Sequence, residues 1–425
     1  MPASGVSGDQ SMKFAQSKAA WYRLAAGSAF AVVLLLALPQ RGAAHTSFFR
    51  WHTDEDFLYI ESDGMPTHKM MVGITAWQQQ VPLPQDYSGD NSFRIPRHPV
   101  LADKPLNVKS ALFSGAIAIA VNGIPIFNPI KNDGKTDTYI AGELDDFGGH
   151  CGRSDDYHYH LAPLFLVDTI GRENPIAYGM DGFPIYGLTE ADGSAPVGLD
   201  ELNGHKDAKG NYHYHSTKGF PYLNGGLRGR VKLVKDAAVS QGLTTAIRPW
   251  LQALKGAKIV GFTWPSPNHY SLEYTIDNKS SFVNFWWDEK KNYTFEFVDP
   301  AGNKRTETYK GRPTRISAYV EADHGGNLIM KPGQSALYAW GSTSATKGET
   351  NVQIYKSTNN AAPENPVATD ACGARSGPFK AISGRTGSAH LTASACQAGY
   401  TYRYTYTASN ATQGASDDVF VTVAN

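Results

Sequence analysis

Six of the 13 histidines lie within 66 residues and repeat one spacing. In each group, a histidine is followed by seven residues, a second histidine, one residue and a third histidine. The two groups are His150, His158 and His160, and then His205, His213 and His215. Three imidazoles are the protein ligands of an open zinc or copper site. The spacing therefore predicts a transition-metal site built from these six histidines.

Acidic residues and one cysteine flank the histidines. Asp145 and Asp146 precede the first group, and Asp200 and Glu201 precede the second. A carboxylate could hold the outer ring nitrogen of a ligating histidine and so fix its tautomer, which is the role we predict for these four residues. Cys151 directly follows His150 and is a candidate additional ligand as a thiolate.

The donor set limits the metal without identifying it. Imidazole suits zinc, copper, iron and nickel, and the neighbouring tyrosines and a secreted location favour copper slightly over zinc. In an enzyme, such an ion would activate water or dioxygen. Two alternatives stay open, namely histidines that are only hydrogen-bonded parts of the sheet and histidines that act as acid or base without a metal.

The histidine groups belong to an internal duplication. Residues 144–160 and 199–215 align without a gap at an offset of 55, and the turn motifs 121–127 and 180–186 align at an offset of 59. The copies therefore span about 121–160 and 180–215. Such a duplication predicts a pseudo-twofold arrangement, with either two equivalent sites or one site shared where the copies meet.

Both copies end in the run Tyr-His-Tyr-His. Because alternate side chains of a strand share one face, the two histidines of a run point one way and the two tyrosines point the other way. Same-face neighbours lie about 6–7 Å apart, within reach of one ion. Strand alternation thus predicts a histidine face and a tyrosine face in each copy.

Together these motifs resemble the YHYH-domain family of bacterial secreted and surface proteins. The resemblance rests on the two Tyr-His-Tyr-His runs, the two Gly-His turns and the segments NGIPIFNP and DGFPIYG, and it covers roughly Phe57 to Arg230. The copies differ beside the first turn, where Cys151 stands in place of Lys206. The family is defined by this pattern, so the resemblance implies a YHYH domain and implies no particular reaction.

The N-terminal segment resembles an export signal. Three basic residues (Lys13, Lys18 and Arg23) precede an apolar run over 24–39, and small residues follow up to Ala44. We expect a signal peptide over 1–44, a secreted or periplasmic location and no transmembrane span after cleavage, with a retained anchor as the alternative. Cleavage would make His45 the first residue, whose amine and imidazole could chelate copper.

Charge argues against nucleic acid as a partner. Lys+Arg and Asp+Glu are equal at 39, and removal of residues 1–44 takes away four basic residues and one acidic residue, which leaves −3. A nucleic-acid partner would favour a basic chain instead.

The rest of the chain predicts a mainly β protein. We expect a β-rich, duplicated YHYH domain over 45–234, a linker helix over 235–256, a small antiparallel β module over 257–313 and an immunoglobulin-like β-sandwich over 314–425. In an oxidising compartment, Cys372 and Cys396 could form a disulfide. The C-terminal β modules are candidates for cell-surface or carbohydrate contact. The alternative function is therefore adhesion, with structural YHYH strands.

Overall fold

The computed structural model describes residues 47–311, 317–331, 334–343, 345, 347–356, 379–380, 387–392 and 400–424. For those of them that fall between 348 and 400, it describes only the backbone. The predicted signal peptide, His45, Cys372 and Cys396 lie outside the described residues. The prediction of a mainly β fold is confirmed.

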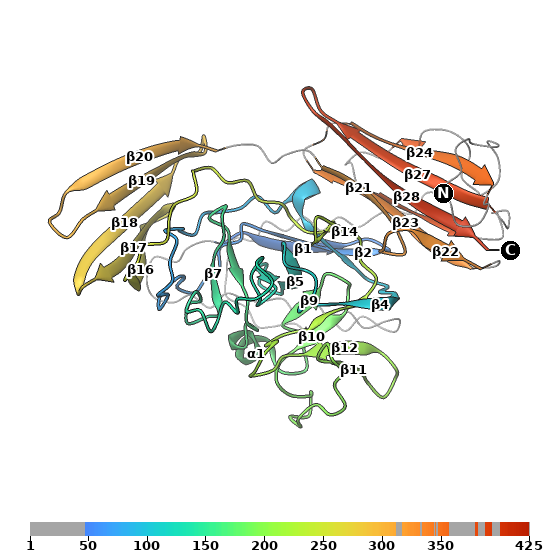
Figure 1. The fold of residues 1–425 in the computed structure, drawn as a ribbon, viewed down its shortest axis with the longest axis horizontal. Helices are drawn as coiled ribbons and strands as arrows, with labels where there is room; N and C mark the ends of the chain where they lie inside the picture. Colours follow the sequence, from blue (N-terminus) through green and yellow to red (C-terminus); the bar gives the residue numbers. More distant parts are fainter. Residues whose placement is uncertain are drawn as a thin grey trace, which may run out of the picture. The chain divides into compact units, whose positions relative to one another are not determined.

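An eight-stranded sheet contains the duplication (Figure 1). Its strands are β5 (Ala116–Ala120), β6 (Pro125–Phe127), β7 (Gly149–Cys151), β8 (Tyr157–Tyr159), β9 (Ala177–Gly179), β10 (Pro184–Tyr186), β11 (Gly204–Lys206) and β12 (Tyr212–His215). Their order is β11-β12-β10-β9-β5-β6-β8-β7, so each copy supplies one half. The halves meet at the antiparallel pair β5 and β9, where Ile119 lies opposite Tyr178.

The register is the same in both halves. Strand β6 runs parallel to β8, and β10 runs parallel to β12, with the same turn-motif isoleucine opposite the second tyrosine of the run. Strands β7 and β8 are antiparallel and place His150 opposite His158, just as β11 and β12 place His205 opposite His213. Two separate histidine groups result, one in each half of the sheet.

Smaller elements complete the N-terminal part of the described chain. These are β1 (Phe49–Thr53), β2 (Phe57–Ser62), β3 (Phe93–Pro96), β4 (Leu101–Asn107), β13 (Gly226–Gly229), β14 (Leu233–Val234), β15 (Ala237–Ala238), the 3-10 turn η1 (Gly89–Asn91) and the helix α1 (Phe165–Ile170). Strands β1, β2 and β3 form one sheet, while β4 pairs with β13 and β14 with β15. Within the described ranges, no helix has the length and apolar character needed to cross a bilayer.

The predicted linker helix over 235–256 is wrong. The segment contains β15 and then follows an extended path with turns. Its polar side chains bond to distant backbone and side chains: Asp236 accepts from the Leu112 amide at 2.8 Å, and the amide oxygen of Gln241 accepts from the Ala116 amide at 2.8 Å. Tertiary contacts of this kind override the weak helical propensity on which the prediction relied, and Pro249 opposes a helix further.

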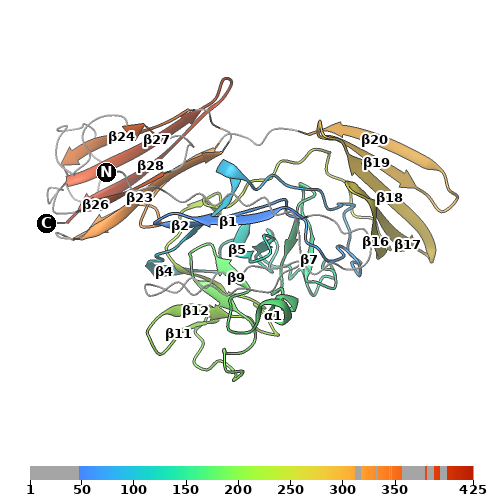
Figure 2. The ribbon, with the colours of Figure 1, turned by 180° about the vertical axis from the view of Figure 1, so that it is seen from behind.

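The predicted small antiparallel module is a sheet of five strands in sequence order (Figure 2). The strands are β16 (Lys258–Ser266), β17 (His269–Ile276), β18 (Lys279–Trp287), β19 (Asn292–Val298) and β20 (Lys304–Lys310). Alternate side chains such as Phe262, Leu272, Phe285 and Phe295 are buried on one face. The period-two pattern that predicted this β module is the direct consequence of that one-sided burial.

Two further sheets form the C-terminal sandwich. One contains β21 (Ser317–Ala322), β23 (Ser335–Thr343) and β26 (Gly387–Thr392), and the other contains β22 (Leu328–Met330), β28 (Gly414–Val423), β27 (Tyr400–Ser409), β24 (Lys347–Lys356) and β25 (Phe379–Lys380). Val320 and Tyr338 from one sheet share an apolar core with Tyr402, Tyr404 and Val421 from the other. This packing confirms the predicted β-sandwich.

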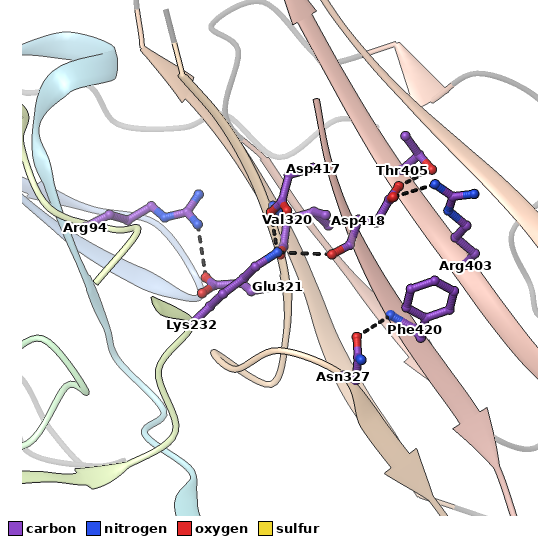
Figure 3. Close-up of polar contacts among 10 residues, drawn as sticks. All are labelled: Arg94, Lys232, Val320, Glu321, Asn327, Arg403, Thr405, Asp417, Asp418 and Phe420. Carbon is purple, nitrogen blue, oxygen red and sulfur yellow. Dashed lines mark hydrogen bonds and ion pairs between the residues drawn. The ribbon is translucent and has the colours of Figure 1, made fainter. Parts of the chain in front are cut away.

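Charged side chains connect the sandwich strands with β3 and with Lys232 (Figure 3). The Arg94 guanidinium donates to Glu321 Oε1 at 3.1 Å, and both side chains are almost fully buried. Lys232 Nζ donates to the Val320 carbonyl at 2.8 Å and also pairs with Asp417. Removing one member of a buried ion pair leaves an uncompensated charge and lowers the free energy of unfolding by about 3–5 kcal/mol. Substitution of either Arg94 or Glu321 alone should therefore destabilise the protein.

Candidate metal centres

An aspartate closes the turn that leads into the first histidine group. Asp145 Oδ1 accepts from the backbone amides of Phe147 at 2.9 Å and Gly149 at 3.1 Å. Its other oxygen accepts from the Tyr157 hydroxyl at 2.8 Å. The carboxylate therefore fixes the turn and attaches it to the tyrosine face of β8.

The second copy repeats this arrangement. Asp200 Oδ1 accepts from the backbone amides of Leu202 at 2.9 Å and Gly204 at 3.1 Å, and Oδ2 accepts from the Tyr212 hydroxyl at 2.9 Å. The residue before each first histidine must be glycine, because a Cβ on Gly149 or Gly204 would collide with the tyrosine hydroxyl across the strand pair. The Gly-His motif thus reflects how closely a tyrosine crosses each turn.

The four carboxylates that were predicted to hold the imidazoles have other surroundings in the structure. Asp145 and Asp200 bond to tyrosines and backbone amides, and the side chains of Asp146 and Glu201 are exposed. A strand separates its two faces, so a carboxylate that reaches the tyrosine face is directed away from the histidine face.

Backbone carbonyls contact the outer ring nitrogens instead. In the first group, His160 Nδ1 lies 2.7 Å from the carbonyl oxygen of Asn128 and His158 Nδ1 lies 3.0 Å from that of Asp156. His150 bonds to the backbone of Glu143. Because a carbonyl can only accept, Nδ1 carries the proton wherever it makes such a bond.

The second group uses equivalent backbone positions for His213 and His215 and a nearby one for His205. His215 Nδ1 lies 3.1 Å from the carbonyl oxygen of Gly187, the counterpart of Asn128 at the offset of 59. His205 Nδ1 lies 2.9 Å from the carbonyl oxygen of Val197, and His213 bonds to the backbone of Asn211. The carbonyl contacts orient the imidazoles and select the tautomer, which is the usual preparation of a metal-ligating histidine.

The inner ring nitrogens converge. In the first group, the Nε2 atoms of His150 and His160 are 3.0 Å apart. In the second group, His213 Nε2 lies 3.0 Å from His205 Nε2 and 3.1 Å from His215 Nε2. The carbonyl contacts place the proton of His160, His205 and His215 on Nδ1, so the Nε2 of each of these rings presents a lone pair toward its neighbour, an arrangement that a cation between the rings would stabilise.

Burial favours the neutral form of His150, His160, His213 and His215. It lowers the pKa of His150 and of His160 well below the ordinary value, and neighbouring histidines and Lys131 lower both further. Burial also lowers the pKa of His213 and of His215. Neutral imidazole is the form that binds a metal ion.

The second group has a fourth member that sequence reasoning missed. Glu190 Oε1 lies 3.2 Å from His205 Nε2 and 3.5 Å from His215 Nε2. One ligand atom from Glu190 and one from each of the three histidines all lie within 4.8 Å of one another. The turn-motif alignment, extended by four residues, pairs Glu190 with Lys131 of the first copy. This reversal of charge between the copies is the sequence signal that could have drawn attention to Glu190.

The first group opens into a cavity of about 550 Å³. The lining includes its three histidines, Lys131 and Glu143, and the ammonium of Lys131 lies 2.6 Å from Glu143 Oε1. The ring of Phe127 stacks on that of His158 at 3.9 Å between centroids. The three histidines thus face a space large enough for a small molecule, with an ion pair at its wall.

Cys151 does not join the group in which it was a candidate ligand. The atoms grouped within 4.8 Å come from the three imidazoles, and strand alternation directs Cys151 away from His150. Its thiol is buried, and burial raises its pKa well above the ordinary value, to which Asp155 and Asp156 add. A buried, protonated thiol is a poor metal ligand.

Comparison with protein families identifies the segment that carries the first group. Residues 92–197 match the family model described as YHYH protein. This segment is a YHYH domain. The YHYH match includes the whole first histidine group and ends after the turn motif of the second copy.

Two other comparisons give no relative on which to base a function. No curated protein matches the chain. Among solved structures, the full ectodomain of mouse nectin-like molecule 4 (Ig1–Ig3) matches at 15% identity and a TM-score of 0.19, over 40% of this chain. The chain spans 58% of the length of that ectodomain.

Proposed function

We propose that this chain is a secreted or periplasmic protein that binds two transition-metal ions, one in each half of the duplicated sheet. The observation that carries the proposal is the convergence of inner ring nitrogens in both histidine groups, while the outer nitrogens bond to backbone carbonyls. A separation of 3.0–3.1 Å agrees with two ligands of one ion, since metal–nitrogen bonds of about 2.0–2.1 Å place neighbouring nitrogens about 2.9–3.4 Å apart.

The tyrosine face supports this division of roles. Tyr157 and Tyr212 hold the turns through Asp145 and Asp200, so the structural hydrogen bonds of the Tyr-His-Tyr-His runs lie on the face opposite the histidines. In a purely structural motif, the ring nitrogens would be expected to find separate hydrogen-bond partners, whereas here the Nε2 atoms of neighbouring imidazoles face one another.

Imidazole and carboxylate donors without thiolate suit zinc and copper(II). The preference for copper over zinc stays a prediction from the tyrosine-rich, exported sequence. Competition between the two ions for the metal-free protein, followed by elemental analysis, decides between them. Catalysis through activation of water or dioxygen would be a property of an open site.

Elemental analysis of the protein purified from its native host tests the proposal. We expect two equivalents of a transition metal, and the loss of one equivalent in His160→Ala and of the other in His215→Ala. The matched control is His98→Ala, because His98 is exposed and lies outside both groups. Substoichiometric metal in the native protein, or unchanged content in the double variant, would refute the proposal.

Adhesion through the C-terminal β modules remains the alternative function. It predicts that cell or carbohydrate binding by the full chain persists when both histidine groups are disabled. Loss of a measured activity together with the metal favours the metal-dependent function instead.

A further inference from the structure

The two proposed sites differ in how many ligands the chain supplies. Building on the proposed function, we propose that the first site keeps one coordination position open for a small anionic ligand from solvent, whereas Glu190 fills that position in the second site. Only the first site would then bind a ligand from solvent.

The second group has the composition of a closed site. Three imidazoles and the Glu190 carboxylate supply four ligand atoms, which is the number that completes a tetrahedral shell. Glu190 also contributes a negative charge, so a bound divalent ion retains a net charge of about +1. Both effects reduce the affinity for an added anion.

Within the described part of the chain, no carboxylate joins the first group in this way. Lys131 occupies the position equivalent to Glu190, and a protonated amine cannot ligate a metal. Glu143 binds its ammonium at 2.6 Å and holds it at the cavity wall. The Lys131–Glu143 pair is neutral as a whole, so an ion bound by three neutral imidazoles retains its full double charge.

The cavity provides the space for the missing ligand. Its volume of about 550 Å³ far exceeds one water molecule, and the histidines, Lys131 and the aromatic ring of Phe127 share its wall. An anion bound to the ion there would also approach the ammonium of Lys131. The expected ligand is therefore a small anion, such as azide or a short carboxylate.

Azide titration of the cobalt(II)-loaded full chain tests the inference. His215→Ala retains the first site and His160→Ala retains the second, so each spectrum reports one site. We expect azide to change the visible cobalt spectrum of His215→Ala with an affinity at least about tenfold higher than that of His160→Ala. An equal or reversed response would overturn the inference. Absence of cobalt from both variants would refute the proposed function itself.

Exchanging the distinguishing residue provides a second readout. In the His215→Ala background, Lys131→Glu should retain cobalt and lose the azide response, while the control Lys131→Gln should retain the response. Glu190→Gln in the His160→Ala background should gain one. Both positions are partly exposed, which favours folding of these variants. An undiminished azide response in cobalt-loaded Lys131→Glu would contradict the inference.

Discussion

The two halves of the eight-stranded sheet share a backbone and differ at the rim of their histidine groups. Register, carbonyl contacts and the tyrosine–aspartate bonds repeat in both halves. The loop after the turn motif does not repeat, since it brings Glu190 to one group and Lys131 to the other. After duplication, the strands are constrained by packing, whereas a loop position can change its charge without disturbing the sheet.

The largest expected effect comes from removing one imidazole. His215→Ala should lower metal affinity at the second site by more than about 100-fold. Loss of a hydrogen-bond partner of a ligand lowers metal affinity by about 10–100-fold, and loss of the ligand itself should lower it further. The first site should be unaffected. Calorimetric titration of the metal-free protein measures both affinities, and a parallel loss at the two sites would show that they are coupled.

A difference on the tyrosine face predicts a pH effect. Tyr214 donates to buried Asp181 at 2.6 Å, whereas its counterpart Tyr159 accepts from Asn122 at 3.0 Å. Burial raises the pKa of Asp181 to about 6, so folding favours its protonated form, and the stabilisation present below pH 4 is lost as the pH rises through 6.

Asp181→Asn makes the second copy resemble the first. Between pH 4 and pH 7, the free energy of unfolding of the metal-free wild type should fall by about 2 kcal/mol relative to this variant. Denaturant titrations at both pH values measure the difference. Asn122→Asp is the reciprocal variant and should introduce a similar dependence. Parallel pH profiles for wild type and Asp181→Asn would show that the carboxyl titrates alike in both states.

Removing the fourth ligand gives a smaller effect. Glu190→Gln should lower metal affinity at the second site by about tenfold, since three imidazoles remain, and should leave the first site unchanged. Lys131→Gln is the matched control, which should not weaken metal binding at the first site. An unchanged affinity in Glu190→Gln would indicate that the carboxylate lies near the ion without binding it.

Cys151 should have the smallest effect. Because its thiol is buried and directed away from His150, Cys151→Ala should leave the metal content at one equivalent per site. The Cys151 thiol should react slowly with a thiol reagent in the native protein and readily after unfolding. Loss of metal from the first site alone would restore Cys151 as a ligand.

Several features could be predicted because they depend on local periodicity. Alternation placed the histidines and tyrosines of each run on opposite faces, and it also indicated the antiparallel β module after residue 257. Local patterns were insufficient over 235–256, where the predicted helix is wrong. There, Asp236 and Gln241 bond to residues more than 100 positions away, which no local pattern can reveal.

The sequence by itself determined the mainly β class, the duplication and which histidines gather in each copy, since these follow from strand period and repeat spacing. Only the tertiary structure decided which atoms complete each group. The carbonyls of Asn128 and Gly187 belong to the residues directly after β6 and β10, and Glu190 approaches from a loop. Such contacts depend on the path of the chain through space, and that path distinguishes a four-ligand group from one that opens into a cavity.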